Sequence, residues 1–290
     1  MKIIYTLIRQ AIATSVLLST CLTTAYAVDN TSCDPTKLAT KYPRLVGKTI
    51  KIGQDGESPP FSMHDPKDFN RLIGLDTDIA RAAFTCVGVP VEFVTGKWSG
   101  LIPATMAGQI DIMWDQLLYT PERAKKLDFI AYMNSATGLL VTKGNPTHIK
   151  TLDNLCGLKA TAVLGTTQEA MLRETNTKCT STGKQAIDII TSPDIPSGLR
   201  LVQSKRADVL VGNKFVVDTM VAANPGTVDI AFDINTGAKL AVGVAKGNSD
   251  LVNAIHDSLT ILQANGTLKS IYARYNINYG LVIKPEVLTK

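Results

Sequence analysis

The fold class of this chain follows from one stretch, residues 110–123, with the sequence Ile-Asp-Ile-Met-Trp-Asp-Gln-Leu-Leu-Tyr-Thr-Pro-Glu-Arg. Its beginning, Ile110–Trp114, is mostly apolar and predicts a short buried strand. A helix is expected to begin after Thr120, because threonine can cap a helix and Pro121 at the first helical position gives up no hydrogen bond. The stretch therefore predicts a buried strand followed closely by a helix.

The same alternation of strands and helices continues on both sides. Asp76–Val87 predicts a helix with one apolar face that ends at Gly88, and Val91–Val94 predicts the strand after it. Further segments extend the alternation: Thr49–Gly53, Leu101–Ala107, Gly138–Thr142, Lys159–Leu164, Ile187–Ile190, Gly198–Ser204, Asp208–Val211, Phe215–Ala223, Val228–Phe232, Lys239–Lys246, Leu251–Leu262 and Leu268–Tyr275. We therefore expect an α/β protein whose sheets are mostly parallel.

The first residues have the three regions of a secretory signal peptide. Positive charges at Lys2 and Arg9 precede a mainly apolar run over residues 12–22, and Ala25-Tyr26-Ala27 matches a cleavage site. Cleavage after Ala27 is expected to deliver residues 28–290 to the periplasm.

Two alternatives to a cleaved signal peptide are a buried N-terminal helix and a lipoprotein. Leu18-Ser19-Thr20-Cys21 loosely resembles a lipobox, although threonine directly before the cysteine fits that pattern poorly. No later stretch of the sequence is long enough to span a bilayer. The cleaved signal peptide remains the favoured interpretation.

The charges of the chain indicate a solvated surface. The net charge is +5, and Lys2 and Arg9 account for two of these charges, which leaves about +3 after processing. Because lysine and arginine are interleaved with acidic residues, no nucleic-acid partner is expected. No metal and no cofactor are expected either, since there is no CxxC motif and His64, His148 and His256 are far from any cysteine cluster.

A series of short strings follows between residues 50 and 276. They are Ile52-Gly53-Gln54-Asp55, Pro59-Pro60-Phe61, Ile73–Ala80, Trp98–Ala104, Gly108–Ile112, Thr120–Arg123, Asp128-Phe129, Gly165–Glu169, Ala207-Asp208 and Ala264–Leu268. Together, and in this order, they resemble the family-3 extracellular solute-binding proteins, the polar-amino-acid-binding proteins of ABC importers. The resemblance implies a two-lobed periplasmic-binding-protein fold of type II with a two-strand hinge.

The resemblance also implies how the chain is divided. Residues 28–140 are expected to form the first part of lobe 1, residues 141–239 lobe 2, and residues 240–290 the C-terminal return to lobe 1. Crossings near Leu139–Thr142 and Lys239–Val242 would form the hinge. Members of this family bind their ligand between the lobes, and a membrane ABC permease then recognises the closed form. We expect a monomer.

Cysteine usage predicts two disulfides. Without Cys21 the exported chain keeps Cys33, Cys86, Cys156 and Cys179, and an even number of cysteines is typical of disulfide pairing outside the cell. Three pairings are possible. We favour Cys33–Cys86 and Cys156–Cys179, because each pair then lies within one expected lobe.

Arg123 and Thr167 are the expected carboxylate end of the cleft. The guanidinium of Arg123 offers a planar fork for bidentate bonding and lies in the first turn of a helix, where free N–H groups also favour an anion. Thr166 and Thr167 open a second helix, and Thr166 is spaced with Glu169 as a capping box. Thr167 matches the family's ligand-contacting position, so it is favoured over Thr166. Both remain candidates.

Two aromatic residues are candidate walls of the cleft. Trp98 matches a family position that lines the side-chain pocket, and its ring can hold a cation or an aliphatic group. Phe61 is expected to be simple core, because aromatic residues beside proline are more often buried than functional.

The other end of the cleft departs from the family pattern. The differing positions are Ser58, Asp115, Gln116, Leu118 and Asn213. Asn213 stands where the family often has the acid that pairs with the ligand ammonium. Asp115 and Glu57 are the candidates to replace that negative charge, and Asp115 is favoured because it ends a buried strand, where open α/β sheets place ligand groups.

One cation and one or two acids suit a zwitterionic or cationic amino acid better than an acidic one. The sequence therefore predicts the solute-binding component of an ABC importer and not an enzyme. One alternative is an enzyme resembling cyclohexadienyl dehydratase, for which Asp115 would supply the acid. The other is a sensing module for a separate receptor.

Overall fold

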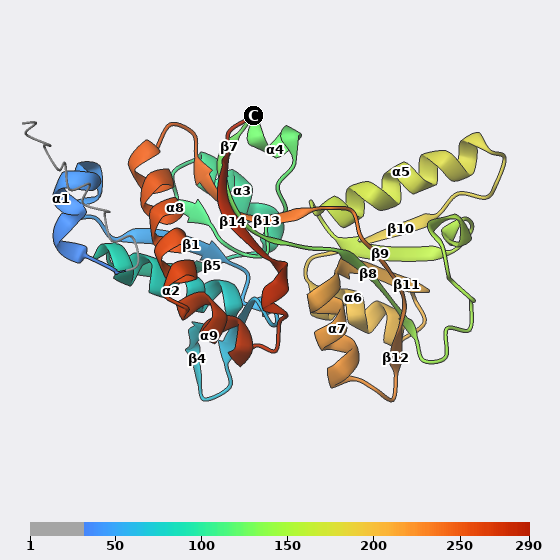
Figure 1. The fold of residues 1–290 in the computed structure, drawn as a ribbon. Helices are drawn as coiled ribbons and strands as arrows, with labels where there is room; N and C mark the ends of the chain where they lie inside the picture. The colour runs from blue at the N-terminus through green and yellow to red at the C-terminus, as the bar shows by residue number, and fades with distance from the viewer. Residues whose placement is uncertain (1–31) are drawn as a thin grey trace, which may run out of the picture.

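A computed structural model describes residues 32–290 and shows two α/β lobes (Figure 1). The expected signal peptide, its cleavage after Ala27 and the alternative lipid anchor at Cys21 lie outside the described residues. No helix within residues 32–290 combines the length and apolar character needed to cross a bilayer.

The first lobe is built on a six-stranded sheet. Its strands lie in the order β14 (Val282–Leu288), β7 (Leu127–Asn134), β13 (Lys239–Ala245), β6 (Ile112–Met113), β1 (Ile50–Gln54) and β5 (Val91–Thr95). A separate three-stranded sheet contains β2 (Glu57–Ser58), β3 (Ser62–Asp65) and β4 (Asp68–Ile73). The helices of this lobe are α1 (Leu38–Lys41), α2 (Leu75–Val87), α3 (Trp98–Met106), α4 (Pro121–Ala124), α8 (Ser249–Ala264) and α9 (Thr267–Arg274).

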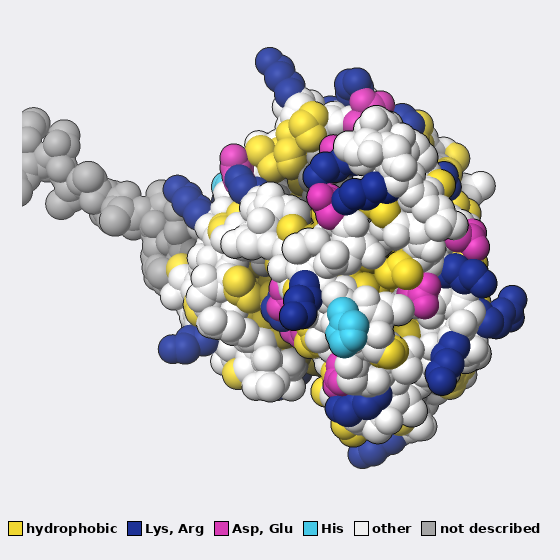
Figure 2. Space-filling view, turned by 90° about the vertical axis from the view of Figure 1, so that its right-hand side faces the viewer, with side chains coloured by type: hydrophobic (Ala, Val, Ile, Leu, Met, Phe, Trp, Pro, Cys, Tyr) yellow, Lys and Arg dark blue, Asp and Glu magenta, His cyan; other side chains and the backbone are white. Residues whose placement is uncertain are grey.

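The second lobe is built on a five-stranded sheet. Its strands lie in the order β10 (Asp188–Ser192), β9 (Lys159–Val163), β11 (Val209–Asn213), β8 (Thr137–Thr142) and β12 (Val228–Ile234). Its helices are α5 (Thr167–Ser181), α6 (Ile195–Gln203) and α7 (Lys214–Ala223). Figure 2 looks at the outer end of this lobe, where basic and acidic side chains are interspersed over the surface.

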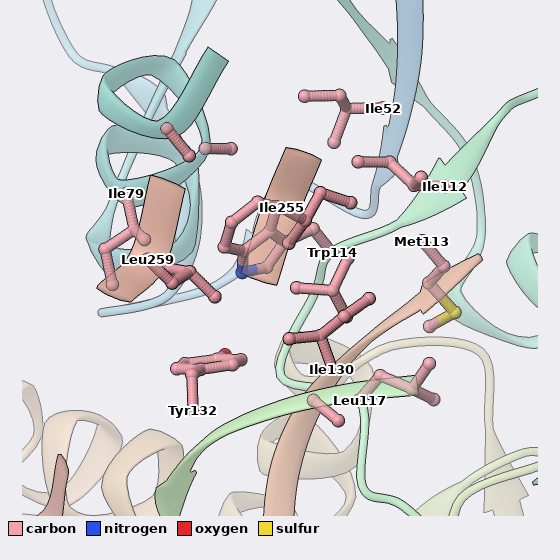
Figure 3. Close-up of a cluster of buried hydrophobic side chains, with 14 of the residues drawn as sticks. Ile52, Ile79, Ile112, Met113, Trp114, Leu117, Ile130, Tyr132, Ile255 and Leu259 are labelled. Atoms are coloured by element: carbon pink, nitrogen blue, oxygen red, sulfur yellow. The ribbon is translucent and has the colours of Figure 1, made fainter. Parts of the chain in front are cut away.

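Trp114 and Tyr132 lie at the centre of the core of the first lobe (Figure 3). Both rings are almost completely buried, and their centroids are 6.1 Å apart. Aliphatic side chains from α2, α8 and the sheet surround them, including Ile79, Ile255, Leu259, Ile52 and Ile112. Burying such side chains contributes roughly 1.5–3 kcal/mol each, so this cluster fixes the ends of β1 and β6 that approach the cleft.

The expected α/β class is confirmed, but the expectation of mostly parallel sheets is wrong. In the first lobe β1 pairs in parallel with β5 and β6, whereas β13 pairs antiparallel with β6 and β7, and β14 antiparallel with β7. The second sheet is mixed in the same way. The reversed strands are β8 and β13, each the first strand after the chain crosses into a lobe, and the C-terminal edge strand β14. None of the three is joined to a parallel neighbour by a strand–helix–strand crossover, which is the connection that parallel strands need.

The chain passes between the two sheets at residues 135–136 and 235–238. The first crossing joins β7 to β8, and the second joins β12 to β13. All of β8 pairs with β11 and β12, so Thr137–Leu140 belong to the sheet of the second lobe. From the sequence, residues up to 140 were expected to form the first part of lobe 1. Two crossings this short make the connection between the lobes a narrow hinge.

Several elements differ from the sequence expectations. β7, β14 and the three-stranded sheet were not expected, α3 begins at Trp98 instead of Leu101, and β6 covers only Ile112–Met113 of the expected strand. Phe61 is completely buried, as expected.

Both expected disulfides are confirmed. Cys33–Cys86 joins the N-terminal part of the described chain to the end of α2, and Cys156–Cys179 joins the segment before β9 to α5. Each bond therefore lies within one lobe and leaves the crossings unconstrained.

Candidate functional site

A cavity between the two lobes is lined by residues from both. The first lobe contributes Asp55, Ser58, Trp98 and Gln116; the second contributes Val163, Thr166, Gln168, Ile195, Val211, Gly212 and Asn213. The cavity volume is about 20 Å3, which is about the space that holds one water molecule. An amino acid therefore fits only after the lobes separate or the lining side chains move.

The lobes are in direct contact around this cavity. Val163, Ile195 and Val216 of the second lobe belong to the apolar cluster of the first lobe. The rings of Phe61 and Phe215 meet edge to face with their centroids 6.2 Å apart. This arrangement is a closed cleft.

Arg123 lies between the lobes, at the start of the short helix that Thr120 caps. Its Nη1 donates to the carbonyl oxygen of Leu118 at 2.7 Å, and its Nη2 donates across the cleft to Gly165 at 3.1 Å. The guanidinium carbon lies 5.2 Å from the ring centre of Trp98. Burial lowers the pKa of Arg123 to about 10, so the group remains charged at neutral pH and faces the cleft as a cation.

Thr166 and Thr167 point to different spaces. The Thr166 side chain caps α5 by accepting from the Glu169 N–H, and it also lines the small cavity. The Glu169 side chain accepts from the N–H of Gly165. Thr167 lies with Leu118 in a neighbouring groove of about 430 Å3, beside the second crossing. This groove is large enough for an amino acid and adjoins Arg123 through Leu118.

Asp115 is completely buried beneath the cavity. Its Oδ2 accepts from the N–H of Asp55 at 2.9 Å, and its Oδ1 has no hydrogen-bond partner among the described residues. The indole N–H of Trp98 donates to its carbonyl oxygen at 3.3 Å. Burial, with the nearby charges of Asp55 and Asp76, raises the pKa of Asp115 well above its usual range, although the N–H of Asp55 opposes this shift. Asp115 therefore supports the cavity floor but does not line it.

Asp55 lines the cavity, although it is not among the site residues predicted from the sequence. Its carboxylate accepts from the Ser58 hydroxyl at 2.6 Å and from the Glu57 N–H at 2.9 Å. Burial raises its pKa to about 6. One signal was present in the sequence: Asp55 follows β1 as Asp115 follows β6, and these strands pair in parallel with Gly53 opposite Met113. Residues that follow neighbouring parallel strands meet at one sheet edge.

Asp76 is a second buried acid that is not among the site residues predicted from the sequence. It accepts from the Tyr132 hydroxyl and from the Gln116 N–H, both at 2.6 Å. Burial raises its pKa to about 7. Gln116 has a φ of 44°, a conformation that costs a non-glycine residue energy. Asp76 therefore holds Gln116, whose Nε2 reaches Ser58 at 3.3 Å, at the cavity wall.

Glu57 and Asn213 are each occupied by another group. The Glu57 carboxylate lies 3.0 Å from Lys97 Nζ and does not line the cavity. The Asn213 side chain lines the cavity, caps α7 by accepting from the N–H of Phe215, and donates to Ser135 at 3.3 Å. In the described part of the chain, no three His, Cys, Asp or Glu side chains gather closely enough to hold a metal ion.

Known proteins resemble this chain over most of its length. The L-cystine-binding protein TcyJ of Escherichia coli (strain K12) is 29% identical over 228 residues, which are 78% of this chain and 82% of that protein. The L-arginine-binding protein of Pseudomonas aeruginosa is 26% identical over 79% of this chain and 88% of its own length. Both are binding proteins, which confirms the expectation of a non-enzyme.

Solved structures share the fold. An ancestral arginine-binding protein bound to arginine is 30% identical, with a TM-score of 0.72 over 78% of this chain and 97% of that one. The ancestral amino acid-binding protein AncCDT-1, a precursor of cyclohexadienyl dehydratase, is also 30% identical, with a TM-score of 0.70 over 83% and 98% of the two chains. The model of the bacterial extracellular solute-binding proteins, family 3, matches residues 50–278. The chain therefore belongs to the family-3 bacterial extracellular solute-binding proteins.

Proposed function

We propose that this protein captures a zwitterionic or cationic amino acid between its lobes and delivers it to an ABC permease. The observation that carries the proposal is the placement of one cation, Arg123, between the lobes beside Trp98, while Asp55 lines the cavity with Asp115 hydrogen-bonded behind it. A ligand with a carboxylate and an ammonium complements both charges, because a buried charge is costly unless it is paired.

Each ligand group has a candidate partner. Arg123 and the start of α5 at Thr167 would bind the carboxylate, since both offer N–H donors. Asp55 would receive the ammonium, with Asp115 behind it and Trp98 as the apolar wall. The names of the matched relatives support an amino acid, because they bind cystine and arginine.

The remaining parts of the proposal concern the setting of the protein. We place it in the periplasm after cleavage behind Ala27, as a monomer that meets the permease in its closed form. The family assignment supports an extracellular location.

The ligand is found by native mass spectrometry of the purified protein, followed by thermal-shift measurements with L-arginine, L-cystine and L-glutamine, and with glucose as the control. A ligand at 100 times its dissociation constant stabilises the folded state by about 2.7 kcal/mol. If glucose raises the melting temperature and none of the amino acids does, the proposal is overturned.

Replacing Arg123 by methionine tests the carboxylate clamp. We expect the R123M variant to fold and to lose at least about 100-fold in affinity for the amino acid that shifts the wild type, since a charged hydrogen-bonded pair is lost. R71M, which changes an exposed arginine on β4, is the matched control. Equal affinity of R123M and R71M would refute the clamp.

A further inference from the structure

We infer that Lys97 is a positioning residue that latches the two lobes together by binding acids from both of them. Its Nζ lies 3.0 Å from Glu57 Oε2 in the first lobe and 2.8 Å from Asp194 Oδ2 in the second. None of these three residues lines the small cavity. The latch therefore acts on closure and not on the ligand.

The acid in the second lobe is held rigidly. Asp194 is the N-cap of α6, where its Oδ1 accepts from the N–H of Ser197 at 2.8 Å, so its other oxygen is left for Lys97. Burial alone would raise the pKa of Asp194, but the hydrogen bonds from Lys97 and Ser197 outweigh it and lower the pKa to about 2. The Asp194 carboxylate is therefore ionised at neutral pH.

Glu57 holds the Lys97 ammonium on the first lobe. Because Glu57 and Lys97 belong to the same lobe, opening of the cleft breaks the bond to Asp194 and leaves the bond to Glu57 intact. Glu57 then keeps the ammonium near its closed position, which reduces the side-chain entropy lost when the lobes meet again. This role accounts for Glu57 without placing it on the ligand.

The latch is weak and sensitive to salt. The Lys97 side chain is 57% exposed, and exposed ion pairs contribute little and are screened by ions. Other contacts also hold the lobes together: the apolar packing of second-lobe side chains on the core of the first lobe, the aromatic edge of Phe61 on Phe215, and the bond from Arg123 to the Gly165 carbonyl. We therefore expect closure to shift by about 2- to 5-fold in population when the latch is removed.

Small-angle X-ray scattering of the ligand-free protein tests the latch directly. K97M and D194N should increase the radius of gyration relative to the wild type. K97R keeps the positive charge and should have the same radius of gyration as the wild type. Asparagine caps a helix as well as aspartate does, so D194N removes the charge and keeps α6. K143M is the matched control, since Lys143 forms an ion pair of similar exposure, at 2.7 Å, with Asp229 inside the second lobe. Equal radii for K97M and K143M would overturn the latch.

A second measurement rests on the proposed function and uses L-arginine as the probe. K97M and D194N should release L-arginine about 2- to 5-fold faster than K143M at low salt, and the difference should vanish near 1 M NaCl. If neither L-arginine nor any other amino acid tested binds the wild type, that result counts against the proposed function and leaves the scattering result standing. If L-arginine binds and is released equally fast by all variants, the latch is refuted and the proposed function is not.

Discussion

Asp76 shows at the scale of one residue how burial alters ionisation. It lies in the first turn of α2, completely buried, and accepts from Tyr132 and Gln116. Its pKa is raised to about 7, whereas an unfolded aspartate titrates near 3.9. Between about pH 4 and pH 7 the folded protein therefore keeps a proton that the unfolded chain has released.

This difference predicts the pH dependence of stability. The free energy of unfolding should fall as pH rises through that window, by at most about 1.4 kcal/mol per pH unit for this one group. Asp55, with a pKa raised to about 6, should add to the fall between about pH 4 and pH 6. The D76N variant should lose its share of the slope and be at least as stable as the wild type near pH 8. Urea unfolding at several pH values measures this, with D68N on the exposed β3–β4 hairpin as the control. An unchanged slope in D76N would contradict the prediction.

The sequence predicted five of the eleven residues that line the cavity, but not the partners of those residues. Trp98, Ser58, Gln116, Thr166 and Asn213 were expected and line the cavity. Asp55 was missed because its importance depends on lying beside Asp115 across two strands 60 residues apart in the chain. Glu57 was expected at the ligand, but the sequence did not indicate that Lys97 would occupy it.

At the scale of elements, segments with local signals were predicted well. α2 ends at Gly88 in the left-handed conformation, as expected from a helix stop, and Thr120 and Thr166 cap their helices. β14 was missed because Val282–Leu288 contains Pro285 and two charged residues, and proline is usually excluded from central strands. It forms as an edge strand, where it pairs with β7 alone.

The two disulfides should stabilise their lobes unequally. Cys33–Cys86 spans 53 residues and Cys156–Cys179 spans 23, so the chain-entropy relation gives about 4 and about 3 kcal/mol. Guanidinium unfolding of the C33S/C86S and C156S/C179S variants measures each cost against the wild type. A variant as stable as the wild type would contradict the expectation for that bond.

At the scale of the whole molecule, closure and ligand binding are linked. The cavity of about 20 Å3 is too small for an amino acid, so a ligand enters while the lobes are apart. Contacts made only in the closed form then contribute to affinity, because they stabilise the state that encloses the ligand.

The edge of Phe215 against Phe61 is such a contact. An aromatic pair contributes about 1 kcal/mol, so F215A should weaken binding of L-arginine by about 5-fold although Phe215 does not line the small cavity. Isothermal titration calorimetry measures the affinity. F69A removes a ring that is 73% exposed on the hairpin of the first lobe and should bind as the wild type does. Equal affinity of F215A and F69A would show that this contact adds nothing to closure.

The sequence by itself determined the family, the α/β class and the helix caps at Thr120 and Thr166. These features depend on residues close together in the chain or on motifs in a fixed order, and local hydrogen bonding and burial dictate them. Only the tertiary structure decided the mixed sheets, the meeting of Asp55 with Asp115, and the pairing of Lys97 with Glu57 and Asp194. Each of these depends on strand order or on how two lobes approach one another, and no local pattern encodes the distance between residues that lie far apart in the chain.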